Sequence, residues 1–111
     1  MNKDTKLTFD HVGVPTKKSQ EGESYLEDGK CYVTDPVNTK FNIEFLRPED
    51  GCPYPPVVLE RQHVSYIVEN LDEALEGENV LVEPFNPIPT RRLAFIDYEG
   101  LLIELAEEVE E

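Results

Sequence analysis

The stretch QHVSYIVENLDEALEGENVLVEPFNPIPTRRLAFIDYEGLLIELAE, residues 62–107, decides how the rest of the chain is interpreted. It opens with the alternating run HVSYIV and continues into a short helical segment, NLDEALEG, in which acidic residues follow Asn70. Two β-like runs come next, VLVEPF and RRLAFIDY, and the turn sequence Tyr98-Glu99-Gly100 leads into the closing run LLIELAE. Alternating apolar runs predict strands, so this stretch predicts a strand–helix–strand–strand–strand unit.

The part of the chain before this stretch carries a reduced copy of the same pattern. The run TFDHVGVP resembles the opening of the later unit, and FNIEFLRPE resembles its end. His11 and His63 lie near the starts of the two copies, 52 residues apart, and Glu44 and Glu104 lie near their ends, 60 residues apart. A repeated supersecondary unit is therefore indicated, and the unequal spacing means that the copies differ by insertions or deletions.

These patterns give the expected organisation of the chain. We expect a single domain over residues 1–111, with a degenerate first module at 7–48, a linker at 49–61 and a second module at 62–107. The linker region is marked by PEDGCPYPP, which holds four of the nine prolines. The polar segment 16–29 leaves room for a helix of one or two turns, without an apolar stripe to support a longer one. The fold class is then α+β, a mostly β, curved sheet with small helices on its outer face.

The alternation of side chains along strands places four chemically active residues on one type of face. His11, Glu44, His63 and Glu104 each lie opposite the apolar positions of their own strand. Those faces are expected to line a concavity that holds two imidazoles and two carboxylates. Mixed nitrogen and oxygen ligation suits a divalent zinc, nickel, cobalt, manganese or iron ion, and ligand type alone does not choose among them. The alternative is that a lone histidine beside Asp10 is an ordinary, hydrogen-bonded strand residue.

Composition limits the partners of the chain. Its 111 residues carry a formal net charge of −14, which disfavours nucleic acid and anionic membranes. No apolar run is long enough to cross a bilayer, and the N-terminal residues lack the apolar core of a signal peptide. We therefore expect a cytoplasmic protein in which Cys31 and Cys52 stay as free thiols. The acidic end, Glu107 to Glu111, is expected to be a frayed, solvated terminus.

Four pieces of the sequence resemble the vicinal oxygen chelate superfamily, which includes glyoxalase I, methylmalonyl-CoA epimerase, extradiol dioxygenases and fosfomycin-resistance proteins. They are FDHVGVP, NIEFLRPE, HVSYIVENLDEAL and LAFIDYEGLLIELAE. The resemblance implies paired βαβββ modules that form a U-shaped, half-open β-barrel around one divalent metal, with the first module shortened. It places His11, Glu44, His63 and Glu104 at metal-ligand positions and implies a homodimer.

The resemblance also implies a class of chemistry. It suggests a lyase or isomerase, similar to glyoxalase I or methylmalonyl-CoA epimerase, that uses enolate or enediolate chemistry on a small carbonyl substrate, with Glu104 or Glu44 as the catalytic base. The alternatives are a non-catalytic module that sequesters a small molecule, and an oxygenase with two histidines and one carboxylate, against which a fourth ligand argues.

Three residues are candidates for substrate contact: Arg91, Arg92 and Tyr54. Because Arg91 and Arg92 are adjacent in a strand, only one of them faces the concavity.

Overall fold

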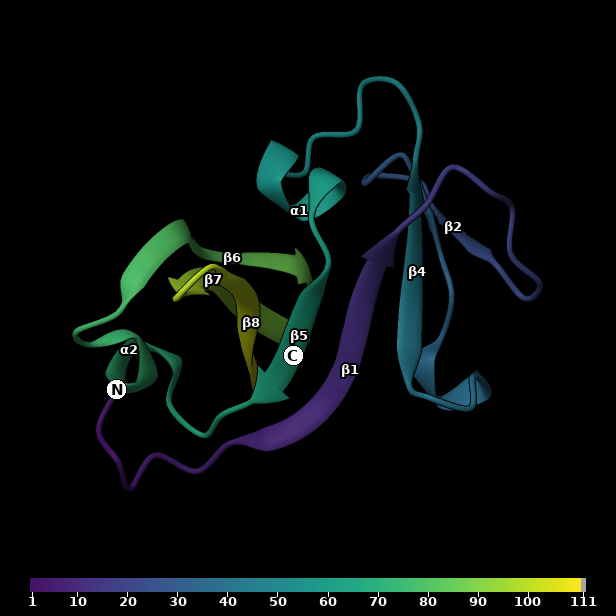
Figure 1. Ribbon diagram of the computed structural model, residues 1–111. Helices are drawn as coiled ribbons and strands as arrows, with labels where there is room; N and C mark the ends of the chain where they lie inside the picture. Colours follow the sequence, from purple (N-terminus) through teal and green to yellow (C-terminus); the bar gives the residue numbers. More distant parts are fainter. Residues whose placement is uncertain (111) are drawn as a thin grey trace. The chain divides into compact units, whose positions relative to one another are not determined.

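Strands dominate the computed structural model, which describes residues 1–110 (Figure 1). The strands are β1 (Thr8–Pro15), β2 (Ser24–Leu26), β3 (Cys31–Val33), β4 (Ile43–Pro48), β5 (His63–Ile67), β6 (Asn79–Ile88), β7 (Arg91–Tyr98) and β8 (Leu101–Glu108). The helices are short: the 3-10 helix η1 (Pro36–Asn38) and the α-helices α1 (Pro56–Glu60) and α2 (Leu71–Leu75).

The chain divides into two compact units. One unit, here called the His unit, is His11–His63, and the other, the hairpin unit, combines Met1–Asp10 with the chain from Val64 onward. Neighbouring strands in the His unit follow the order β2-β3-β4-β1, and those in the hairpin unit follow β5-β8-β7-β6. The second module, β5–α2–β6–β7–β8, has the βαβββ order, and the first module, β1 to β4, has no helix directly after β1. The predicted fold class, paired βαβββ modules with the first one shortened, is confirmed.

The segment between β1 and β3 departs from the expectation. The sequence left room for a helix of one or two turns at 16–29, but this part of the structure holds turns and the short strand β2. Strand β2 pairs antiparallel with β3, with Tyr25 opposite Tyr32. A polar segment without an apolar stripe gains little by forming a helix, whereas backbone pairing with β3 satisfies its peptide groups.

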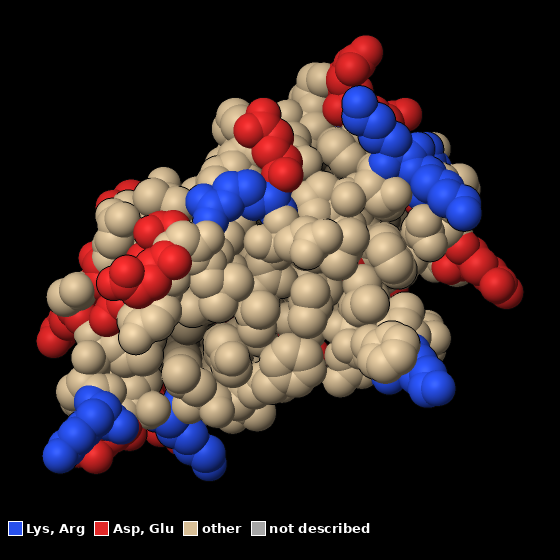
Figure 2. Space-filling view, in the orientation of Figure 1, with Lys and Arg blue, Asp and Glu red and all other residues tan. Residues whose placement is uncertain are grey.

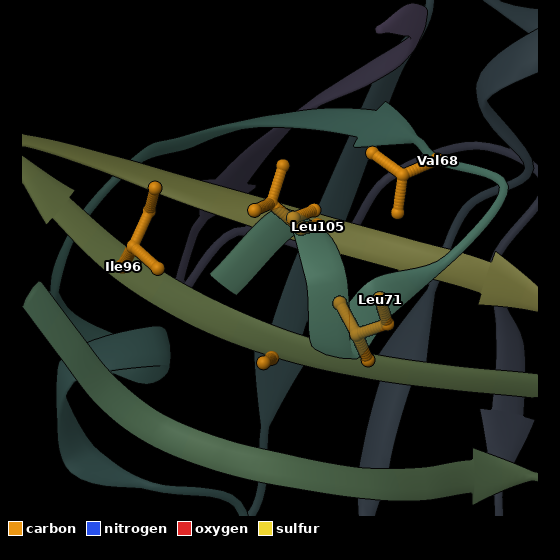
Figure 3. Packing of buried hydrophobic residues seen from close by; sticks show 6 residues of the cluster. Val68, Leu71, Ile96 and Leu105 are labelled. Carbon is orange, nitrogen blue, oxygen red and sulfur yellow. The ribbon is translucent and has the colours of Figure 1, made fainter. Parts of the chain in front are cut away.

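The core of the hairpin unit lies between α2 and the sheet. Figure 3 shows Val68 and Leu71 beside Ile96 and Leu105, all of which are buried. Helix α2 begins as the sequence predicted, because the Asn70 side chain accepts a hydrogen bond of 3.0 Å from the Glu73 amide. Five residues are enough here because two of them, Leu71 and Ala74, are fully buried. Burial of one face, rather than helix propensity, therefore holds this helix in place.

Strands β7 and β8 form the closing hairpin that the sequence predicted. They pair antiparallel from Arg91 opposite Glu108 to Tyr98 opposite Leu101. The turn residues Glu99 and Gly100 have φ values of 50° and 92°, the left-handed conformations that a tight hairpin turn needs. This continuous pairing fixes which side chains of β7 and β8 lie on the same face of the hairpin.

The first residues of the acidic end do not form the frayed terminus that the sequence led us to expect. Glu107 and Glu108 belong to β8, and the carboxylate of Glu107 accepts a hydrogen bond of 2.7 Å from the Leu71 amide. That bond satisfies a free amide at the start of α2, where a negative charge is favourable. Glu111 lies outside the described residues.

Figure 2 shows the Lys and Arg side chains in separate groups with acidic side chains beside them. Cys31, which is buried, and Cys52 are both free thiols, as predicted. Within residues 1–110, no helix is both long and apolar enough to span a lipid bilayer.

Candidate metal centre

Three of the four predicted ligand residues lie together in the His unit. Strands β1 and β4 run side by side and parallel, and their register sets Gly13 opposite Glu44 (Figure 1). His11 therefore lies two residues before the point of β1 that faces Glu44, on the same face of the strand as Gly13. His63 is the first residue of β5 and follows α1 in the chain.

The side chains of these three residues converge. One ligand atom from each of His11, Glu44 and His63 lies within 4.8 Å of the other two. The Nε2 atom of His11 is 3.7 Å from Oε1 of Glu44, and the two imidazole rings meet edge to face with centroids 5.6 Å apart. His11 and His63 are only 3% and 2% exposed, whereas the Glu44 side chain is 26% exposed. The group thus has two buried imidazoles and one carboxylate open to one side.

Burial controls the protonation of His63. Burial, with a smaller contribution from charge repulsion by the neighbouring His11, lowers the pKa of this imidazole from 6.5 to about 4. His63 is therefore neutral near pH 7, which is the form of histidine that binds a metal ion. Protonation of His63 therefore does not compete with metal binding until the pH falls toward 4.

The three residues fit a transition-metal ion. Two imidazoles and a carboxylate are ligands suited to first-row divalent metals. Ligands about 2.0–2.2 Å from one ion are at most about 4 Å apart, so a group within 4.8 Å closes on an ion by small side-chain movements. His11, Glu44 and His63 are the residues that would hold it.

Glu104, the fourth predicted ligand, belongs to the hairpin unit. It lies on β8 opposite Phe95 of β7 and is 6% exposed. The hydroxyl of Ser65 donates a hydrogen bond to its Oε2 atom. A buried carboxylate held by a hydroxyl keeps a fixed orientation, which both a metal ligand and a catalytic base require.

The two adjacent arginines lie on opposite faces of β7. The register sets Leu93 opposite Ala106 and Phe95 opposite Glu104, so Arg91 is on the Glu104 face and Arg92 on the other. The Nη1 atom of Arg91 lies 3.3 Å from Oδ2 of Asp10, and its Nη2 atom lies 3.7 Å from Oε1 of Glu108. Arg92 donates a hydrogen bond of 2.8 Å to Asp72 at the start of α2.

Tyr54 lies in the His unit, half-buried in the proline-rich segment. Its hydroxyl packs on Gly29, where an added Cβ would lie 2.5 Å from the phenol oxygen. Burial raises the pKa of Tyr54, with further contributions from Cys31, Cys52, Glu44 and Asp28. The phenol is therefore protonated at neutral pH and able to donate a hydrogen bond.

Sequence reasoning missed two features of this region. The alternation of side chains along the strand predicted that Ser65 lies on the same face as His63. No pattern in the sequence predicted the hydrogen bond from its hydroxyl to Glu104. The faces that carry the ligand residues are also more deeply buried than the opposite faces: His11 and Gly13 are buried, whereas Val12 and Val14 are half-buried. On β1 the face that carries the ligand is therefore the more buried one.

Comparison with known proteins agrees with this architecture. No family model matches the sequence, and no curated protein matches it. A hypothetical protein from Bacillus halodurans C-125 has a similar structure, with a TM-score of 0.67 and 20% identity over 98% of each chain. Methylmalonyl-CoA epimerase from Mycobacterium tuberculosis matches with a TM-score of 0.64 and 19% identity, over 99% of this chain and 94% of that one. The chain has the vicinal oxygen chelate fold. At these identities the likeness shows the fold alone, and the activity rests on the residues of this chain.

Proposed function

We propose that this chain is a metal-dependent lyase or isomerase that moves a proton at the carbon next to a carbonyl group of a small substrate. The observation that carries the proposal is the buried His11–Glu44–His63 group, whose ligand atoms lie within 4.8 Å of one another. The fold supports it, because a solved structure of similar architecture is a methylmalonyl-CoA epimerase. When bound, a divalent cation supplies a Lewis acid that stabilises negative charge on a carbonyl oxygen.

The residues of the chain have distinct roles in this proposal. His11, Glu44 and His63 hold the cation, and Glu104 is the fourth ligand. The catalytic base is Glu104 or Glu44, since a carboxylate beside the substrate is able to take the proton. Ser65, which donates its hydroxyl proton to Glu104, keeps that carboxylate oriented. Both imidazoles are buried, so little bulk water reaches them.

Metal content is the first test. Protein purified without a His tag should contain about one equivalent of nickel, cobalt, zinc, manganese or iron, and His63→Ala should contain almost none. Glu60→Gln is a matched control, because Glu60 is exposed on α1 only three residues before His63. Wild-type protein that binds no divalent metal, even after titration, would overturn the proposal.

Proton exchange tests the chemistry and separates the two carboxylates. Hemithioacetal and acyl-CoA substrates should exchange the proton next to their carbonyl group in deuterated water when metal is present. The Gln variant of the base should lose this exchange at least 100-fold, the usual size of a general-base contribution, while keeping its metal. If both Glu44→Gln and Glu104→Gln exchange as fast as wild type, neither carboxylate is the base.

Arg91 is the arginine that we propose for substrate contact, together with Tyr54. Arg91 lies on the Glu104 face of β7, and Arg92 lies on the opposite face with Asp72. Arg91→Lys should therefore raise KM with little change in kcat, and Arg92→Lys should leave both unchanged. Tyr54→Phe should also raise KM, because it removes one hydrogen-bond donor.

A second function is favoured by one feature of the site. Two histidines and one carboxylate are the ligand set of non-haem iron oxygenases, and His11, His63 and Glu44 form that set within a single unit. Protein loaded with ferrous iron would then consume oxygen with a catechol substrate. Proton exchange without oxygen consumption supports the lyase or isomerase, and the reverse result supports the oxygenase.

A binding protein is the alternative outcome of the same assays. Tight retention of a small molecule without turnover would mean that the chain sequesters its ligand.

We also propose a homodimer, because apolar side chains of the hairpin unit, including Leu101 and Tyr98, are 46% and 59% exposed. Sedimentation analysis should give twice the monomer mass of 12.7 kDa.

A further inference from the structure

Gly13 lies next to residues of the candidate metal centre. It is buried in β1, two residues after His11, and its Cα is the register partner of Glu44 on β4. The imidazole of His63 packs directly on it. A Cβ atom added to Gly13 would lie 2.0 Å from Cε1, 2.3 Å from Nε2 and 2.6 Å from Nδ1 of that ring.

Position 13 requires a glycine because there is no room for a side chain, and not because of its backbone conformation. Gly22, Gly51, Gly77 and Gly100 have positive φ values, which favour glycine on conformational grounds. Gly13 is not among them, and it lies in a regular strand that any residue type is able to form. The ring of His63 occupies the volume that the side chain of residue 13 would fill.

We propose that Gly13 is a positioning residue for the metal centre: its missing side chain lets the His63 imidazole lie against β1, within reach of His11 and Glu44. This inference rests on the proposed function of that site. The edge-to-face contact of the two imidazoles, at 5.6 Å between centroids, requires the close approach that Gly13 permits. The histidine from β5 therefore reaches a site whose other ligands lie on β1 and β4.

The size of the overlap sets the expected effect. Real Cβ atoms essentially never approach another heavy atom closer than 3.0 Å, so an alanine at position 13 must displace the ring by about 1 Å. Metal sites tolerate ligand displacements of only about 0.2 Å. Residues that orient a ligand without touching the metal typically change metal affinity 10- to 100-fold. Gly13→Ala should weaken metal binding by a factor in this range.

A double-mutant cycle in metal-free protein tests the contact itself. Gly13→Ala should lower the urea midpoint of unfolding in the wild-type background. It should lower it much less in the His63→Ala background, where the imidazole that it overlaps is gone. If Gly13→Ala alone does not fold, the double variant should still fold. An equal loss in both backgrounds, or a double variant that does not fold either, would overturn the proposal.

Metal binding tests the positioning role. Titration with cobalt(II) should give a 10- to 100-fold weaker Kd for Gly13→Ala and altered visible absorption bands, which report the geometry of the cobalt ligands. Gly29→Ala is the matched control: Gly29 is also buried and has no positive φ, and its added Cβ would meet the Tyr54 hydroxyl at 2.5 Å instead. This control should keep the wild-type cobalt spectrum, and its stability loss should be the same in the His63→Ala background.

The two measurements keep the inference separate from the proposed function. If wild-type protein binds no cobalt, the proposed function fails, whereas the double-mutant cycle still reports whether residue 13 positions His63. If wild type binds cobalt and Gly13→Ala binds it with unchanged Kd and spectrum, the positioning role fails and the metal site stands.

Discussion

Among single residues, Glu23 and Arg47 show how one neighbour fixes a protonation state. The guanidinium of Arg47 donates two hydrogen bonds to the Glu23 carboxylate, at 2.9 and 2.8 Å, and also lies over the ring of Tyr32. The pair links β4 to the loop that precedes β2, and this loop has no helix. Bidentate pairing of this kind favours the charged carboxylate over the neutral acid.

The ionisation of Glu23 gives the first prediction. The hydrogen bonds from Arg47 lower its pKa from 4.5 to about 2, with smaller effects from Gln20 and Ser19. Because the folded pKa lies below the unfolded one, the stabilisation is complete above pH 4.5 and is lost as the pH falls toward 2. Carboxyl NMR should show Glu23 still ionised at a pH where exposed glutamates are protonated. In Arg47→Ala its pKa should rise toward 4.5, and an unchanged low pKa in this variant would contradict the assignment.

The two cysteines give the second prediction. Cys31 is fully buried, and burial raises the pKa of its thiol to about 11, with a smaller contribution from Cys52. The thiolate is the reactive form, so iodoacetamide should modify Cys52 and leave Cys31 intact in the native protein at pH 8. Peptide mass mapping reads the result. Unfolded protein, in which both thiols should react, is the control, and equal labelling of both thiols in native protein would refute the prediction.

At the scale of elements, α2 depends on its cap and on its buried face. The helix is only Leu71–Leu75, too short to be stable alone. Two acceptors satisfy amides at its start: the Asn70 side chain accepts from Glu73, and the Glu107 carboxylate accepts from Leu71. A side chain from β8 thus helps to begin a helix that comes 36 residues earlier in the chain.

The cap of α2 gives the third prediction. Asn70→Ala removes the acceptor for the Glu73 amide and should lower the free energy of unfolding by about 1 kcal/mol. Urea unfolding followed by circular dichroism measures the loss. Asn70→Asp should stay close to wild type, since aspartate caps helices equally well. A loss of equal size in both variants would show that the hydrogen bond is not the cause.

At the scale of the whole molecule, the candidate metal centre gathers residues that are far apart in the sequence. His11, Glu44 and His63 come from three different strands and span the full length of the His unit. The folded chain brings their ligand atoms together, and the unfolded chain does not. A ligand that binds only the folded form stabilises it by mass action.

Metal-dependent stability gives the fourth prediction. At 100 times its Kd, a metal ion that binds only the folded protein adds about 2.7 kcal/mol to the free energy of unfolding. Nickel, cobalt and zinc should raise the Tm of chelator-treated protein by several degrees, and magnesium and calcium should not, because the latter prefer oxygen ligands. His63→Ala should abolish the shift. A rise of equal size with magnesium would indicate general charge neutralisation of this acidic chain.

The sequence by itself determined the elements and the faces of the strands. Alternation set Glu44 and His63 on the faces where the structure has them, and Asn70 and Gly100 marked a helix start and a hairpin turn. These properties are local, since a side chain's face follows from its position within one strand.

Only the tertiary structure decided how those faces come together. The register that sets Gly13 opposite Glu44, the packing of His63 on Gly13, and the hydrogen bond from Ser65 to Glu104 join residues that are distant in the chain. The helix α1 within the expected linker, and the strand β2 where the sequence left room for a short helix, were also decided there. The physical reason is that strand register depends on pairing with a partner strand, and a shift of one strand by a single residue would move the ligand on that strand to the other face.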